Sequence, residues 1–158
     1  MHHDVELSPS EAFMAAAVGS FRQAESSYFN RKLTHGVSAD ADILSLHILG
    51  AAGELAVAKV LGRYWGGDVG SFKKADLGQS VQVRTRSKHE YDLIVRADDN
   101  PDDVYVLVTG TPTRLRVHGW IRGTDARRDE WIQTHGNRPP AWFVPQSALR
   151  PLKKGASK

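Results

Sequence analysis

The first part of the chain carries apolar residues at helical spacing on one face. They are Phe13, Ala17, Phe21, Ala24 and Tyr28. The sequence Ser-Pro-Ser-Glu at residues 8–11 is a capping box with proline at the first helical position. This pattern predicts a helix over residues 8–31. A turn should follow at residues 32–38, which include Gly36.

A second, more apolar segment begins near Ser38 or Asp40 and runs to Gly62. Its large apolar residues cover most of a helical circumference, which is typical of a buried helix. They are Ile43, Leu44, Leu46, Ile48, Leu49, Leu55, Val57, Val60 and Leu61. Residues 50–53 (GAAG) form a band of small side chains, which would let a neighbouring element approach closely.

After Gly66 and Gly67 the period of the pattern changes from helical to two, which is typical of strands. Val81 and Val83 alternate with polar residues, and this predicts a strand with one polar face. Further strands are predicted over residues 91–96, 104–109, 115–121 and 141–144. A short helix is expected over residues 124–133, packing Trp131. The tail at residues 153–158 is expected to be disordered.

The composition is that of one globular domain. The chain has 158 residues, 41% of them hydrophobic and 25% charged, so it is long enough to bury a core but short for two domains. There is no cysteine, which excludes disulfides and thiolate metal sites. No apolar run in the sequence suggests a membrane span, and the N-terminal residues do not resemble a secretion signal. We therefore expect a cytoplasmic protein that does not interact with a membrane, in a bacterial or phage-infected cell.

The net charge of +3 is small, but the distribution of positive charge indicates a partner. Arginine outnumbers lysine in the middle and later parts of the chain, and arginine binds phosphate with two parallel hydrogen bonds. The basic residues there are Arg84, Arg86, Lys88, Arg96, Arg114, Arg116, Arg122, Arg127 and Arg128. This pattern is compatible with nucleic acid as the partner, but on charge alone a solvated polar face is an equally open alternative.

Four residues are candidates for phosphodiester chemistry. Glu54 is a carboxylate within the apolar helix, and Asp76 precedes the strand on which Gln82 and Arg84 share the polar face. Hydrolysis of a phosphodiester uses a divalent cation to polarise the phosphoryl group and activate water. Mg²⁺ prefers oxygen ligands, and a nearby positive side chain stabilises the charge of the transition state. Two acids, one amide oxygen and one guanidinium would supply these parts.

Three segments resemble the PD-(D/E)XK nuclease-like superfamily. Residues 53–62 (GELAVAKVLG) are similar to its first helix, and residues 75–78 (ADLG) with 81–85 (VQVRT) are similar to its aspartate and (D/E)-x-K strand. Residues 117–121 and 141–145 resemble the closing strands of small phage-type members. The resemblance covers residues 42–152. It implies a single domain with an α/β (α+β), restriction-endonuclease-like fold, in which two N-terminal helices (residues 8–62) precede a sheet-rich part (residues 70–145) whose mixed central sheet is flanked by helices.

The resemblance also implies an activity, which is metal-dependent hydrolysis of DNA. Mg²⁺ or Mn²⁺ would be held by Asp76, Glu54 and Gln82 together with the carbonyl of Val83. Arg84 would orient water or the scissile phosphate, and homodimers are common when both strands are cut. Two residues depart from the superfamily pattern: Gln82 replaces the acid of the pair, and Arg84, which is always protonated, replaces the lysine.

These departures leave three hypotheses open. The chain is an active DNA nuclease, a nucleic-acid-binding domain that has lost catalysis, or a phage accessory protein that binds another protein. In the second case Arg84, Arg86 and Lys88 would bind phosphate without a metal. Each candidate also has a structural interpretation: Glu54 as an ion-paired helix residue, Asp76 as a turn residue, and Gln82 and Arg84 as an exposed strand face.

Other residues are weaker candidates. If the assumed strand register is wrong, Glu90 and Asp92 are the fallback acids. His47 lies two helical turns before Glu54, and we interpret it as a core or rim histidine. Trp120 and Trp142 are more typical of a core than of a base-stacking surface.

Overall fold

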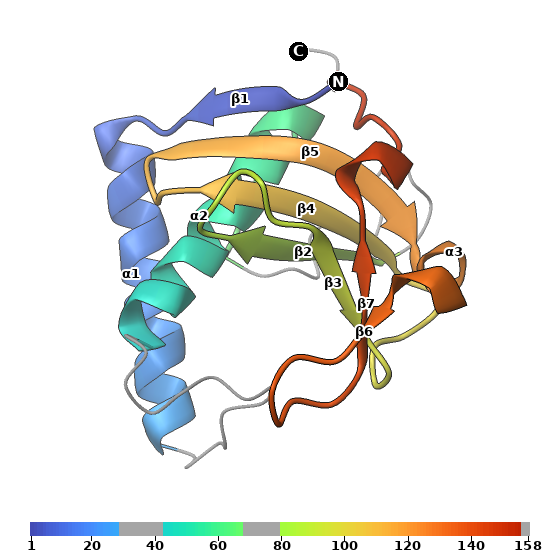
Figure 1. Ribbon diagram of the computed structural model, residues 1–158. Helices are drawn as coiled ribbons and strands as arrows, with labels where there is room; N and C mark the ends of the chain where they lie inside the picture. The colour runs from blue at the N-terminus through green and yellow to red at the C-terminus, as the bar shows by residue number, and fades with distance from the viewer. Residues whose placement is uncertain (29–42, 68–79, 156–158) are drawn as a thin grey trace.

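The computed structural model describes residues 1–28, 43–67 and 80–155. Within them the chain forms a mixed α+β fold with two sheets (Figure 1). The helices are α1 (Pro9–Tyr28), α2 (Ile43–Leu61) and the short α3 (Gly123–Ala126), with single 3-10 turns η2 (Asp129–Trp131) and η3 (Gln146–Ala148). The strands are β1 (His3–Glu6), β2 (Val81–Arg86), β3 (Leu93–Arg96), β4 (Val104–Gly110), β5 (Arg114–Arg122), β6 (Ile132–Gln133) and β7 (Ala141–Val144).

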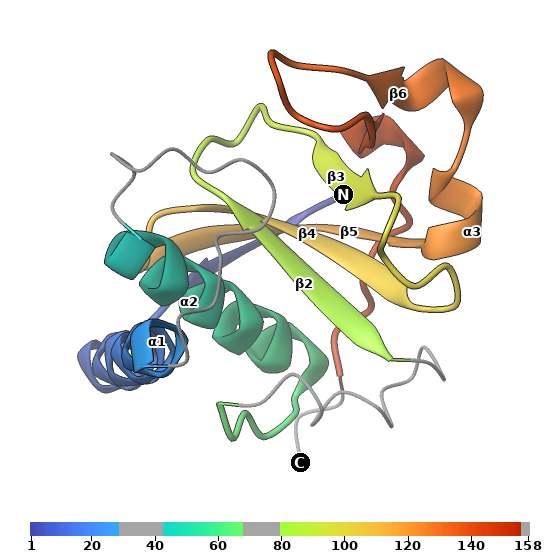
Figure 2. The same cartoon turned by 90° about the horizontal axis from the view of Figure 1, so that it is seen from below.

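The main sheet has the strand order β1-β5-β4-β2, and β2 runs parallel to β4 while the other neighbours are antiparallel. The second sheet has the order β3-β7-β6 and is antiparallel. Helices α1 and α2 cover one face of the main sheet, and the second sheet lies on the other side (Figure 2). The predicted mixed central sheet is therefore confirmed. Helices cover one of its faces, and a small sheet covers the other.

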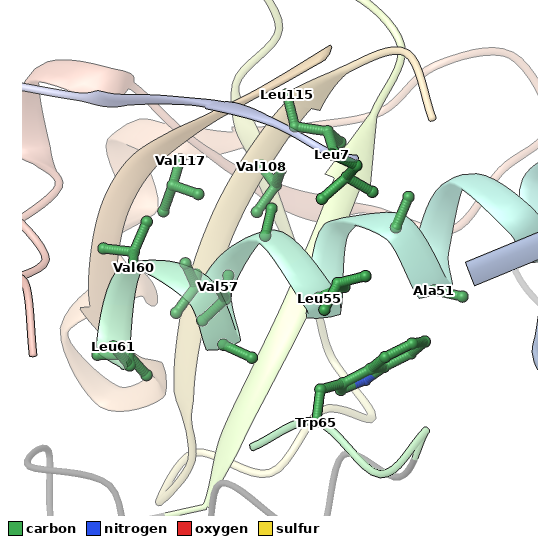
Figure 3. Close-up of a cluster of buried hydrophobic side chains, with 14 of the residues drawn as sticks. Leu7, Ala51, Leu55, Val57, Val60, Leu61, Trp65, Val108, Leu115 and Val117 are labelled. Atoms are coloured by element: carbon green, nitrogen blue, oxygen red, sulfur yellow. The ribbon is translucent and has the colours of Figure 1, made fainter. Parts of the chain in front are cut away.

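Strand β4 is buried along its whole length because both faces of the sheet are covered. Val106 and Val108 belong to the core under the helices, whereas Tyr105 and Leu107 belong to the core under the second sheet. Figure 3 shows Val57 and Val60 of α2 in the first of these cores, beside Val108 and Val117 of the sheet. This sandwich explains the continuous apolar run that predicted β4.

The face on which α1 packs was predicted incorrectly. Phe13 and Phe21 are 75% and 68% exposed, and Ala17, Ala24 and Tyr28 are exposed as well. The helix packs through small residues instead. They are Ala15 and Gly19, both of which are buried. A β-carbon on Gly19 would lie 2.6 Å from the α-carbon of Ile48, so the two helix backbones approach too closely for a large side chain.

The small-residue band on α2 has the role predicted for it at one position. A β-carbon at Gly53 would collide with the hydroxyl of Thr85, so this glycine lets α2 lie directly on β2. From Ala51 to Leu61 the helix is buried except at Lys59, while Leu44 and Leu46 in its first turns are exposed. Contrary to the sequence analysis, α2 is long and apolar enough to cross a membrane, and it is the only such helix among the described residues. It passes this test by length and composition alone, and half of the tested stretch is buried inside the protein.

The first strand was missed by the sequence analysis, and two other predictions need correction. Strand β1 was not foreseen, although it pairs with β5 over four residues. The helix expected over residues 124–133 ends at Ala126, after which the chain forms η2 and β6. The tail is not free at its start, because the amide of Gly155 donates a 2.9 Å hydrogen bond to the carbonyl of Val60. Residues 29–42, which include the predicted turn and the predicted start of α2, lie outside the described residues.

Candidate nucleic-acid interface

Glu54 is a buried carboxylate that joins the two long helices. Both of its oxygens accept hydrogen bonds from the guanidinium of Arg22 on α1, each at 2.9 Å. Trp65 donates a third hydrogen bond from its indole nitrogen at 3.2 Å, and Arg22 also donates to the carbonyl of Gly67. The carboxylate is therefore satisfied by protein donors, and the ion-pair interpretation of Glu54 agrees with the structure.

Gln82 and Arg84 lie on the opposite face of the main sheet from α2. Val81 and Val83 pack in the core under the helices, and side chains alternate along a strand, so Gln82 and Arg84 point toward the second sheet. Gln82 donates to the buried carboxylate of Asp103 at 3.0 Å. The expected convergence of Glu54 and Gln82 on one cation is not what the structure shows.

Arg84 also has an acidic partner. Its guanidinium donates to Asp99 at 2.6 Å and lies over the ring of Tyr105. Asp99 accepts a second hydrogen bond from the backbone amide of Arg96 and so is held in place. A phosphate at Arg84 would have to compete with this ion pair. The expected phosphate contact at Arg84 is therefore less favourable than one at an arginine without an acidic partner.

Asp76, the remaining predicted metal ligand, lies outside the described residues, and so does the segment that carries it. Val83, whose carbonyl was the fourth expected ligand, lies in the interior of β2, which pairs with β4. Across residues 1–28, 43–67 and 80–155, no group of three or more acidic or histidine side chains is arranged to hold a metal ion. Of the expected oxygen donors, Glu54 and Gln82 therefore do not lie together at one site.

A pocket with three arginines lies on the outer face of the second sheet. Its volume is about 430 Å³. Three elements supply the guanidiniums: Arg86 ends β2, Arg96 ends β3, and Arg138 lies in the loop between β6 and β7. The other lining residues are Glu90, Tyr91, Asp92, Ile94, Gln133, His135, Pro139, Ala141 and Phe143.

The three arginines differ in their hydrogen bonds and cation–π contacts within the protein. Arg86 stacks on the ring of Tyr91, with its guanidinium carbon 4.2 Å from the ring centre, and donates to the carbonyl of Asp92 at 2.9 Å. Lys88, the other residue expected to contact phosphate, lies over the same ring at 5.6 Å. The guanidiniums of Arg96 and Arg138 have no hydrogen bond or ion pair to any acid of the described chain. They are available to an anion.

The three guanidiniums of the pocket repel one another. Burial lowers the pKa of Arg86, Tyr91 and Asp92 oppose this shift, and the positive charges of Arg96 and Arg138 add to it with smaller effects. Burial also lowers the pKa of Arg96, the positive charges of Arg84 and Arg138 add to this shift, and Asp99 and Asp98 oppose it. The guanidiniums remain charged at neutral pH, so their mutual repulsion is relieved when an anion binds.

Arg86 and Arg96 were among the basic residues expected to bind nucleic acid, whereas Arg138 and the pocket were not predicted. Arg138 follows Gly136, which has a positive φ of 56°, and precedes two prolines. An arginine at the tip of such a rigid turn is a signal that could have been used. Comparison with known proteins finds no matching family model, no matching curated protein and no matching solved structure.

Proposed function

We propose that the chain is a nucleic-acid-binding domain on a restriction-endonuclease-like fold, and that it binds the phosphates of DNA through Arg86, Arg96 and Arg138. The observation that carries this proposal is the pocket in which two of three guanidiniums have no acidic partner among the residues that the structure describes. Guanidiniums bind phosphate oxygens through strong, charge-assisted hydrogen bonds. The alternation of valine and polar residues on β2, together with the buried helix before it, is what supports the fold family.

The proposal favours binding without catalysis because the described donors do not fit a magnesium ion. Both oxygens of Glu54 are occupied by Arg22, and Gln82 lies on the other face of the sheet. Arg84 is held by Asp99 and cannot act as a base. We therefore derive no cleavage step for these residues.

Fluorescence anisotropy with labelled DNA in EDTA tests the binding. Affinity should fall steeply as salt increases, because each neutralised phosphate releases a condensed counterion. The double variant Arg96→Gln/Arg138→Gln should weaken binding and flatten the log–log salt slope by about 0.7 to 0.9 for each arginine removed. The control Arg114→Gln/Arg122→Gln removes the same charge from exposed positions at the two ends of β5 and should change the slope little.

Two results would contradict the proposal. Absence of binding to any DNA or RNA at low salt would favour a protein-interaction module. Cutting of plasmid or single-stranded DNA with Mg²⁺ or Mn²⁺, abolished by EDTA and by Asp76→Ala, would show an active nuclease instead.

A further inference from the structure

The arginine pocket has a wall that a duplex backbone would not use. Tyr91, Ile94, Pro139 and Phe143 give it an apolar and aromatic lining. Ile94 and Phe143 are direct partners across β3 and β7, so the rigid outer face of the second sheet presents them together. The phosphates of a duplex lie outside its stacked bases, so arginines alone would suffice for duplex binding. An aromatic wall beside phosphate-binding groups is typical of sites that stack an unpaired base.

The ring of Phe143 has an aromatic neighbour in the pocket lining. His135 meets it edge-on, with the ring centres 4.8 Å apart and the planes at 63°. Tyr91 packs against Arg86 through the cation–π contact. Both rings are partly buried. Rings that are already ordered lose little entropy when a base stacks on them.

Two carboxylates line the same pocket, and a pocket for phosphate alone gives them no role. Glu90 and Asp92 would repel a phosphate that approached them. Carboxylates do accept hydrogen bonds from the exocyclic amino groups of bases, as they do from the amino group of cytosine. Positive and negative groups in one pocket therefore match the two ends of a nucleotide, which has an acidic phosphate and a base with hydrogen-bond donors.

On the premise of the proposed function, we infer that this pocket receives one unpaired nucleotide of a single strand. Its phosphate binds Arg96 and Arg138, and its base lies against Tyr91 and Phe143. Glu90 or Asp92 accepts a hydrogen bond from the base, so bases with an amino group are preferred over thymine. The volume of about 430 Å³ is within the range of sites for small ligands of this size.

The test compares labelled oligo-dC, oligo-dT and a duplex, each of about 12 nucleotides or base pairs, at one salt concentration in EDTA. Oligo-dC should bind about tenfold more tightly than either the duplex or oligo-dT. Phe143→Leu keeps an apolar side chain but removes the ring, so it should reduce the preference for single strands while leaving duplex binding unchanged. The combined change Glu90→Gln/Asp92→Asn should reduce the preference for dC over dT.

Tyr64→Ala is the matched control, because it removes an aromatic ring that is 85% exposed and follows α2, outside the pocket. It should leave all three affinities unchanged. Equal affinity for oligo-dC, oligo-dT and duplex, still dependent on Arg96 and Arg138, would overturn this inference and leave the proposed function standing. Failure of every oligonucleotide to bind the unmodified protein would overturn both.

Discussion

Glu54→Gln should destabilise the fold, because the Glu54 carboxylate on α2 forms a buried ion pair with Arg22 on α1. The change keeps the size of the side chain but removes its negative charge, leaving Arg22 without its counter-charge. Removing one partner of a fully buried pair costs about 3–5 kcal/mol. The side chain of Arg22 is 26% exposed and can recover some hydration, so we expect a loss of about 2–3 kcal/mol in the free energy of unfolding.

Urea denaturation followed by tryptophan fluorescence gives this free energy, and a double-mutant cycle isolates the pair. Arg22→Met should cost a similar amount, and the double variant should cost clearly less than the sum. The pair Asp4 and Arg116 is a control: it has a 2.7 Å contact, but the side chain of Asp4 is 66% exposed. Asp4→Asn should cost less than about 1 kcal/mol.

The stabilising role of this ion pair is refuted if Glu54→Gln lowers the free energy of unfolding no more than the exposed control does. It is also refuted if the changes at Arg22 and Glu54 are additive.

The same urea assay also tests whether Glu54 binds magnesium. Because Arg22 occupies both carboxylate oxygens, Mg²⁺ at millimolar concentration should not raise the urea midpoint of the unmodified protein. A rise that Glu54→Gln abolishes would make Glu54 a metal ligand.

Two further predictions concern stability. Phe13→Ala should lower the free energy of unfolding, measured by urea denaturation, by less than about 1 kcal/mol, because the ring is 75% exposed. Leu93→Ala in the second core should lower it by about 2–5 kcal/mol. A similar loss for both variants would refute the orientation of α1. Burial, and then the charges of neighbouring basic residues, lower the pKa of His118 from 6.5 to about 4, so the unfolded chain binds a proton that the folded chain does not. The stability that His118 contributes is therefore complete above pH 6.5 and is lost as the pH falls toward 4, by about 1–2 kcal/mol after allowance for solvent at this partly exposed ring. His118→Gln, which can still bond to Thr109, should remove this part of the pH dependence, and an unchanged profile would contradict the assignment.

The elements of this fold were predictable where local signals agree. The capping box exists as predicted, with Ser8 and Glu11 exchanging hydrogen bonds of 3.1 and 3.2 Å. Strands β2, β3, β4, β5 and β7 were predicted because alternation and continuous apolar runs report one covered face or two, whereas β1 and β6 were missed. The packing face of α1 was missed because helical spacing identifies the most apolar face, whereas this contact selects the smallest side chains. Gly19 against Ile48 requires knowledge of the partner, which the pattern of one helix does not contain.

The candidate site was less predictable because it depends on residues far apart in the sequence. The pattern on β2 placed Gln82 and Arg84 correctly on one polar face, but their partners come from the turn before β4. Asp99 and Asp103 lie in this turn, and nothing local in the sequence shows that their carboxylates are directed at β2. Likewise, the approach of Arg138 to Arg86 depends on how β7 pairs with β3, which is a long-range register.

The pairing of the β2 side chains explains why the candidate interface lies away from the motif that suggested it. On the same face of the strand, Gln82 and Arg84 are bound by Asp103 and Asp99, while the partners of Arg86 within the described residues are a carbonyl and an aromatic ring. Positive charge without an acidic partner therefore begins where the acidic turn ends and continues onto β3 and the β6–β7 loop. A partly buried guanidinium without a counter-ion is unfavourable unless a ligand supplies the charge. Because Asp99 pairs with Arg84, that arginine is less able to bind phosphate, and the arginines most able to bind an anion are those of the pocket.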